Sequence, residues 1–322
     1  MPNSFGRLDA RVAAAPISWG VCEVPDWGLM LPVERVLPEM TSLGLVATEL
    51  GAPGFLPYEP MALAEALGAY GMSLVGGFVP LVLHDESQRA DALARAEVTA
   101  RLFQACGATR FVTAVVQDYD WSRPRRLDAN GMRILGDGLA EVDELCARYD
   151  LLQVLHPHVD TLVETARDVE LALEYTSVRW CLDTGHLQIG GVDPAVFARD
   201  HGDRVGHVHL KDVDNKIAAR VREGELSLVA AVQAGLFTPL GRGDVAVDEV
   251  ILTLEDGGYD GWYVLEQDTA LSEGVPAEGR GPVEDVEASL DFLRSQVVPR
   301  LAAAQAPLPT SDRQSPERIT HP

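Results

Sequence analysis

Cysteines are few in this 322-residue sequence, and the four that are present lie far apart. They form no CxxC pair, so the sequence offers neither a disulfide framework nor a cysteine zinc site. Most have apolar neighbours, and we expect them to be small residues of the core. The four are Cys22, Cys106, Cys146 and Cys181.

Basic residues are also scarce, with 26 Lys and Arg against 49 Asp and Glu and a formal net charge of −23. Nucleic-acid binding relies on Lys and Arg to neutralise phosphates, so this balance argues against DNA or RNA as a partner. It argues equally against an anionic membrane. The acidity also has a simpler role, because a high net charge keeps a protein in solution.

Long apolar runs are absent, since none reaches the roughly 18 to 20 residues that a membrane-spanning helix requires. The chain starts with MPNSFGRLDA, which lacks the basic-then-apolar order of a secretory signal. We therefore expect a cytoplasmic protein that does not bind membranes, and a homo-oligomer is compatible with the sequence. Residues 305–322 are polar and rich in proline, which predicts a disordered tail.

Short apolar runs alternate along the chain with longer amphipathic stretches. Most runs are apolar throughout, as is typical of strands buried on both faces. The expected strands are residues 12–19, 45–50, 73–79, 110–116, 151–156, 178–182, 204–210 and 262–266. Helical patterns lie between them at residues 60–70, 90–105, 132–148, 161–175 and 284–301. Eight βα units favour a closed (β/α)₈ barrel over an open sheet, formed by a single domain of residues 1–304.

The longest interval between expected strands precedes the eighth. Residues 212–261 are predicted to carry an elaborated loop and an extra helix over the barrel mouth. Within them, PLGRGD at residues 239–244 is a compact turn. It is either a segment that shapes the site or a solvated surface loop.

Ionisable residues gather at the ends of the expected strands, and five of the eight histidines lie there. The active site of a (β/α)₈ barrel is built at the C-terminal ends of its strands, so these side chains are expected to converge. In chain order they are Glu49, His156, His158, Asp183, His186, His207, His209, Lys211, Glu266 and Asp268.

Imidazole and carboxylate groups that converge from neighbouring strands predict a site for one divalent metal ion. Mn²⁺, Co²⁺, Fe²⁺ and Zn²⁺ suit such ligands, and Mg²⁺ suits them less. His207 and His209 are two residues apart and therefore share one face of their strand. His209 is nearer the C-terminal end and is expected at the depth of the metal, with His207 hydrogen-bonded one layer deeper.

Three motifs resemble the xylose-isomerase-like barrel superfamily of sugar isomerases and epimerases, over residues 11–301. DTGH at residues 183–186 is similar to the motif that supplies an Asp ligand and a nearby His. HVHLKD at residues 207–212 is similar to HxHxKD, in which the second His is a ligand. Glu266 matches the final ligand of the eighth strand. The resemblance thus implies Asp183, His209 and Glu266 as metal ligands.

The end of the fifth strand separates this chain from many of those epimerases. It has His156, in HPHVDT, where they have a Glu ligand, and it resembles the HHHMGT segment of inosose dehydratases. PISW, TELG and the stretch from GW to EQD also resemble that family, whose matching segments are PIGW, SEVG and GW to EQD. HPH in place of three histidines, and Asp160 where Gly is usual, leave the exact substrate open. The resemblance adds His156 to the metal ligands.

The resemblance implies a metal-dependent hydro-lyase that dehydrates a keto-inositol through an enediolate, with Mn²⁺ or Co²⁺ as the best candidates for the metal. The substrate would be a small polyhydroxylated carbonyl compound. The candidates for proton transfer are His158, His186, Lys211 and Glu49, and those for substrate binding are Trp19, Glu49, His158 and Lys211. Trp19 has two interpretations, stacking on the ring of the substrate or packing in the core.

Three other functions compete with this one. A ketose epimerase or aldose–ketose isomerase would use the same metal and enediolate, but the missing Glu of the fifth strand argues against it. A phosphodiesterase like endonuclease IV would need early histidines and a basic groove, and only His84 precedes the fifth strand. A binding barrel without catalysis is disfavoured by the intact ligand set.

Overall fold

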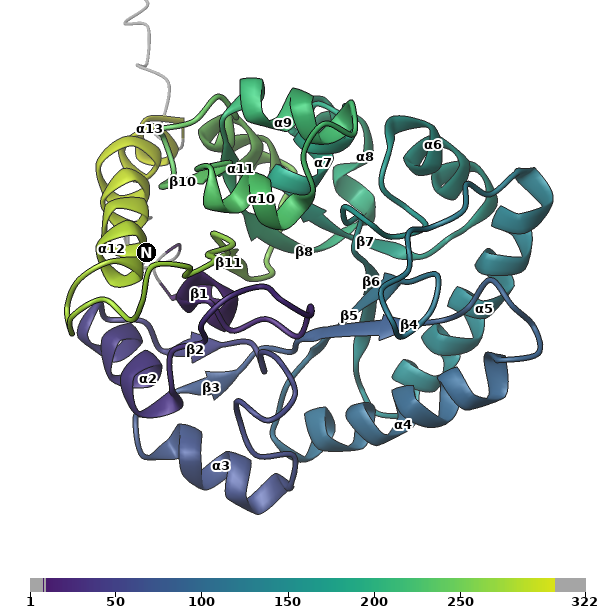
Figure 1. Ribbon diagram of the computed structural model, residues 1–322, viewed down its shortest axis with the longest axis horizontal. Coiled ribbons are helices and arrows are strands. Elements are labelled where there is room, and N and C mark those ends of the chain that lie inside the picture. Colours follow the sequence, from purple (N-terminus) through teal and green to yellow (C-terminus); the bar gives the residue numbers. More distant parts are fainter. Residues whose placement is uncertain (1–7, 9, 305–322) are drawn as a thin grey trace, which may run out of the picture.

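The computed structural model describes residue 8 and residues 10–304, and the tail expected at 305–322 lies outside this range. A parallel barrel stands at the centre, surrounded by helices (Figure 1). The strand order is β3-β2-β1-β11-β8-β7-β6-β5-β4. In chain order the strands are β1 (Val12–Ala14), β2 (Ala47–Thr48), β3 (Ser73–Leu74), β4 (Phe78–Leu81), β5 (Arg110–Val115), β6 (Leu152–Leu155), β7 (Arg179–Asp183), β8 (Val205–Leu210) and β11 (Tyr263–Leu265).

The barrel closes between β3 and β4, which are the two ends of that order and neighbours in the chain. Between them, the Gly76 carbonyl accepts a hydrogen bond from the amide of Leu50 at 2.9 Å, and the Gly77 carbonyl accepts one from Val112 at 3.2 Å. A Cβ atom on Gly76 would lie 2.1 Å from the Arg110 carbonyl oxygen, so only glycine fits at this close approach. The predicted third strand, residues 73–79, is therefore two short pieces, and the predicted (β/α)₈ barrel is confirmed.

Helices form the outer ring of the barrel (Figure 1). They are α2 (Val33–Ser42), α3 (Pro60–Gly68), α4 (Arg89–Ala105), α5 (Ala129–Ala147), α6 (Ala166–Tyr175), α7 (Thr184–Gly190), α8 (Pro194–His201), α11 (Val247–Asp256) and α12 (Pro282–Phe292), which continues through the π-helical turn η3 (Leu293–Val297) into α13 (Val298–Ala304). Short 3₁₀ turns are η1 (Pro16–Trp19) and η2 (Gly202–Arg204). Within the described part of the chain, none of the helices is long and apolar enough to cross a membrane.

The predicted first strand is too long. β1 ends at Ala14, and residues 16–19 turn into the 3₁₀ helix η1. Pro16 has no amide hydrogen to donate to a neighbouring strand, and Gly20 ends the turn at φ +80°, with its amide donating to the Ile17 carbonyl at 2.9 Å. The turn carries Trp19 away from the barrel lumen.

The insertion after β8 contains more structure than the predicted loop and one helix. It begins with β9 (Asp212–Val213), which pairs antiparallel with β10 (Phe237–Thr238), and the helices α9 (Asn215–Arg222) and α10 (Leu228–Gln233) lie between them. The Asp212 carboxylate accepts hydrogen bonds from the amides of Val213, Gly241, Gly243 and Val245 at 2.9 to 3.0 Å. One buried side chain thus fixes the turn at residues 239–244.

Side chains inside the barrel change from apolar to ionisable toward the C-terminal ends of the strands. Residues two apart on a strand point to the same face, and in three such pairs the lower member is small and apolar, whereas on β8 it is His207. The pairs are Val154 and His156, Cys181 and Asp183, and Val264 and Glu266. The fold thus sets a layer of ionisable groups on a floor of small side chains.

Candidate metal centre and active site

The four residues predicted as metal ligands meet at the C-terminal ends of neighbouring strands. Their candidate ligand atoms all lie within 4.8 Å of one another, and all four side chains are buried. His156 Nε2 lies 3.1 Å from Asp183 Oδ2, and His209 Nδ1 lies 3.6 Å from the same oxygen and contacts Glu266 Oε2. Two imidazoles and two carboxylates thus face one point.

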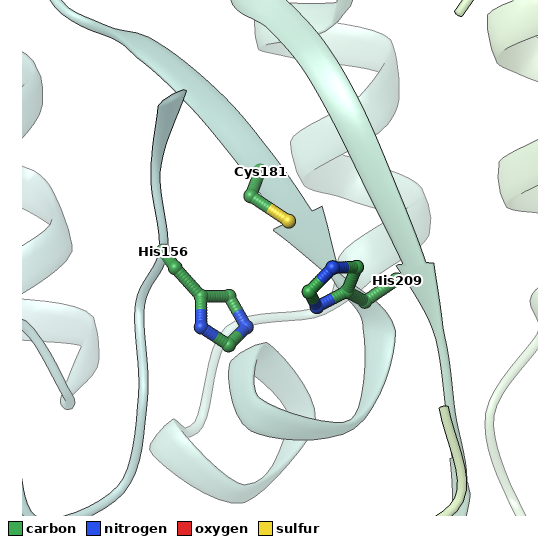
Figure 2. A group of neighbouring side chains, drawn as sticks. All are labelled: His156, Cys181 and His209. Atoms are coloured by element: carbon green, nitrogen blue, oxygen red, sulfur yellow. The ribbon is translucent and has the colours of Figure 1, made fainter. Parts of the chain in front are cut away.

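The Cys181 thiol lies beside the two imidazoles, one layer below Asp183. Figure 2 shows His156 and His209 facing each other with Cys181 next to them. Burial raises the pKa of Cys181 to about 11, so its sulfur keeps its proton at neutral pH. Cys181 therefore belongs to the floor of the site, as its predicted core role implies, and the carboxylates of Asp183 and Glu266 are the better ligands.

Negative charge exceeds positive charge around this point. The Lys211 ammonium lies 2.8 Å from Asp183 Oδ2, 2.7 Å from Glu266 Oε2 and 3.3 Å from Asp268 Oδ1. Burial alone would raise the pKa of Glu266, but His209 and Lys211 outweigh it and hold the pKa at about 2. Glu49 adds a further buried carboxylate. Lys211 and a protonated His209 together do not offset these four acids, and buried charge without a counter-charge is costly, so the residues present fit a divalent cation.

Glu49 orients His209. Its Oε1 atom lies 2.8 Å from His207 Nε2 and 3.0 Å from His209 Nε2. A carboxylate accepts hydrogen bonds, so both Nε2 atoms carry hydrogen, which leaves the lone pair of His209 on Nδ1, toward Asp183 and Glu266. His207 thus lies one layer deeper than the metal ligands and is hydrogen-bonded there, as predicted.

His158 and His186 stack against each other beside this cluster, with ring centroids 3.9 Å apart. His158 Nδ1 lies 2.5 Å from the Val159 carbonyl oxygen. Because a carbonyl only accepts, Nδ1 is protonated and Nε2 carries the lone pair. Burial, together with the nearby His156 and Lys211, lowers the pKa of His158 to about 3, so the ring is neutral at physiological pH.

A cavity opens over the cluster with one ionisable wall and one apolar wall. The ionisable side chains are Glu23, Glu49, His156, His158, Glu266 and Asp268. The apolar wall includes Ile17, Val21, Val24, Trp27, Phe78 and Trp121. Of the residues predicted for proton transfer, His158 and Glu49 line this cavity, whereas His186 and Lys211 lie behind its wall. The arrangement suits a small ring that has polar edges and apolar faces.

The sequence model of the family described as xylose isomerase-like TIM barrel matches residues 39–296. The chain belongs to this family. This chain is 31% identical over 276 residues to an inosose dehydratase of Geobacillus kaustophilus, and the alignment covers 81% of this chain and 89% of that one. It is 32% identical over 284 residues to the rhizopine catabolism protein MocC of Rhizobium meliloti, covering 84% and 86%. The resemblance predicted from the motifs is thus confirmed.

Solved structures of low sequence identity share the fold of this xylose isomerase-like barrel. An L-ribulose 3-epimerase superposes with a TM-score of 0.65 at 16% identity, covering 95% of this chain and 99% of the other. The probable 3-DHS dehydratase AsbF of Bacillus anthracis gives a TM-score of 0.62 at 16% identity, covering 89% and 99%. At these identities the likeness establishes the barrel architecture.

The prediction that Trp19 stacks on a substrate is wrong. In this xylose isomerase-like barrel, Trp19 is 0% exposed, and its indole Nε1 donates to Glu39 Oε2 of α2 at 2.8 Å. It packs in the core, which was the alternative interpretation. The tryptophans that line the cavity are Trp27 and Trp121, which the motifs did not single out. Trp121 follows β5, and its place after a strand end was the available signal.

Proposed function

We propose that the protein is a divalent-metal-dependent hydro-lyase that removes water from a keto-inositol. The observation that carries this proposal is the pair of histidines after β6. His156 lies in the ligand cluster, and His158 lines the cavity as a neutral imidazole with its lone pair on Nε2. Similarity to an inosose dehydratase over 81% of the chain supports the same reaction.

The proposed ligands are His156, Asp183, His209 and Glu266, and Mn²⁺ or Co²⁺ suits this donor set best. A metal ion bound there would supply a Lewis acid that polarises the substrate carbonyl and stabilises the enediolate. Glu49 keeps His209 in the tautomer that ligation requires. Lys211 offsets part of the carboxylate charge.

His158 is the proposed proton carrier. Its Nε2 would take the proton from the carbon next to the carbonyl and return it to the hydroxyl that leaves from the neighbouring carbon. One C–H and one C–O bond break, a C=C bond forms, and water is released, so no oxidant is needed. One imidazole can serve both steps when the hydrogen and the hydroxyl leave from the same face of the ring.

The apolar wall of the cavity would bind the face of the ring. Trp121 stacks on Phe78 with ring centroids 6.2 Å apart and an interplanar angle of 13°, which gives a flat aromatic surface beside His158. The C–H groups of a polyol ring pack against such a surface while its hydroxyls reach the ionisable wall.

The test uses 2-keto-myo-inositol with the metal-free and the Mn²⁺- or Co²⁺-loaded protein. We expect a product that absorbs in the near ultraviolet, formed only by loaded protein. Asp183→Ala and Glu266→Ala should lose both metal and turnover. His158→Ala should retain the metal in elemental analysis and lose rate by about 10²-fold or more.

The competing function is a sugar isomerase or epimerase with the same metal site. Efficient C3 epimerisation of a ketohexose, without dehydration of the keto-inositol, would establish it in place of the hydro-lyase. Full activity of the metal-free protein would refute both. Loss of metal in His158→Ala would exchange the proposed roles of His156 and His158.

A further inference from the structure

A second and larger cavity, of about 520 Å³, lies beside the active-site cavity. Trp121 lines both, and His158 of the first is followed in the chain by Val159 of the second. Its walls come from the loop after β5, the segment that leads into α6, and the insertion around α9 and α10. The insertion after β8 thus forms one wall of the cavity.

Four arginines line this cavity: Arg123, Arg125, Arg126 and Arg222. Acids outnumber bases 49 to 26 in the chain, but four arginines face three acids here. Arg126 forms an ion pair with Asp168, with 2.7 Å between the guanidinium nitrogen and Oδ2. Among the described residues, the guanidinium of Arg222 donates a hydrogen bond to the Ile189 carbonyl alone, at 3.5 Å. Among the residues that the structure describes, the guanidinium groups of Arg123 and Arg125 form no ion pair and no hydrogen bond with another side chain, although the charge of Arg123 acts on two of the acids.

Asp160 and Glu164 form no ion pair or hydrogen bond with an arginine, although arginine charges act on both, and neither carboxylate accepts a hydrogen bond from another described residue. Asp160 holds a φ of +62° and Trp121 a φ of +57°, a backbone region that side-chain-bearing residues seldom adopt. These are two of the four non-glycine residues with positive φ in the described chain, and both line this cavity. Strained residues that face a cavity often serve binding.

We propose that this cavity binds a small hydroxylated anion, such as a sugar phosphate or a sugar acid. Guanidinium groups hold phosphate and carboxylate in a bidentate fashion, and Arg123 and Arg222 supply such groups from two separate walls. The carboxylates of Asp160 and Glu164 are the acceptors for the hydroxyls. The site is separate from the ligand cluster, and its binding does not depend on the proposed reaction.

The experiment is calorimetric titration of the full-length protein with glucose 6-phosphate, with glucose and inorganic phosphate as partial probes. We expect saturable binding of glucose 6-phosphate, weaker binding of phosphate and none of glucose. The double variant Arg123→Gln/Arg222→Gln should bind glucose 6-phosphate at least about tenfold more weakly, because two charge-assisted contacts are lost. The control is Arg199→Gln on α8, whose arginine pairs with Asp200 outside the cavity and whose loss should leave binding unchanged.

Melting temperatures of both variants establish that they fold. Absence of saturable binding, or equal binding by the double variant and the wild type, would overturn the proposal. The latter result would mean that glucose 6-phosphate binds elsewhere on the protein. A further arm measures turnover: an unchanged KM in the presence of glucose 6-phosphate supports a separate site, and competition with the substrate would contradict the separation of the two sites. If the proposed reaction fails, the titration remains valid.

Discussion

Single residues decide which ligand the cavity can bind, and a comparison of Trp121 with Trp19 tests this directly. Trp121 lines the cavity against Phe78, whereas Trp19 is buried and bonded to Glu39. We expect Trp121→Ala to raise the KM for the substrate about tenfold, because it removes the stacking surface, with little change in stability. Trp19→Phe should leave KM unchanged and lower the free energy of unfolding by about 1 to 3 kcal/mol, because the Glu39 carboxylate loses a buried partner. Steady-state kinetics gives the KM of both variants, and denaturant unfolding gives their free energies of unfolding. A raised KM in Trp19→Phe with an unchanged KM in Trp121→Ala would show that Trp19 contacts the substrate.

Glu164 gives a pH-dependent prediction at the same scale. Burial, and then the charge of Asp160, raise its pKa from 4.5 to about 6. The folded state thus binds this proton more tightly than the unfolded chain, and the stabilisation present below pH 4.5 is lost as the pH rises through 6. We expect Glu164→Gln to gain melting temperature relative to the wild type between these values and to keep that gain at higher pH. The matched control is Glu170→Gln at an exposed position of α6, the helix that begins after Glu164, and a parallel response of the two variants would contradict the assignment.

At the scale of elements, Asp212 ties the beginning of the insertion to the turn near its end. Four backbone amides donate to its carboxylate, whereas Asp214, two residues on, caps α9 with two. Asp212→Ala should cost about 3 kcal/mol or more of unfolding free energy, since buried donors are left without an acceptor. Asp214→Ala should cost about 1 kcal/mol, as is usual for a helix cap. Chemical denaturation compares the two, and an equal or smaller loss for Asp212→Ala would show that the turn at 239–244 holds without it.

The elements also show how far the sequence could predict this molecule. The strand-end positions of His156, Asp183, His209 and Glu266 led to the expectation that they converge, and the family resemblance implied them as ligands, whereas period-two alternation served only to separate His209 from His207. The same apolar runs could not reveal where a strand stops. In residues 12–19 the break follows from Pro16 and Gly20, and in 73–79 from a close approach at Gly76 that only the neighbouring strand imposes. Trp121 lies in an irregular loop, where no periodicity marks the side that faces the cavity.

For the whole molecule, closure of the barrel is what assembles the site. The cluster takes side chains from residue 49 to residue 268, and no two neighbouring elements hold more than part of it. Carboxylates from opposite ends of the chain are brought together in a protein that already carries a net charge of −23. Folding without a cation therefore costs free energy, because the carboxylates repel one another where the strands meet.

Metal removal should therefore lower the melting temperature of the whole barrel. A ligand that binds only the folded state stabilises it by about 2.7 kcal/mol at a free concentration 100 times its Kd. For a barrel of this size, we expect Mn²⁺ to raise the melting temperature by roughly 5 °C over protein treated with a chelator. Asp183→Ala should abolish this difference, because it removes a ligand, whereas Asp200→Ala on the outer helix α8 should preserve it. Calorimetry with and without chelator measures the shift. Equal melting temperatures in metal and chelator would mean that Lys211 and His209 suffice to offset the buried carboxylates, and that the cluster is a closed ion network of the barrel.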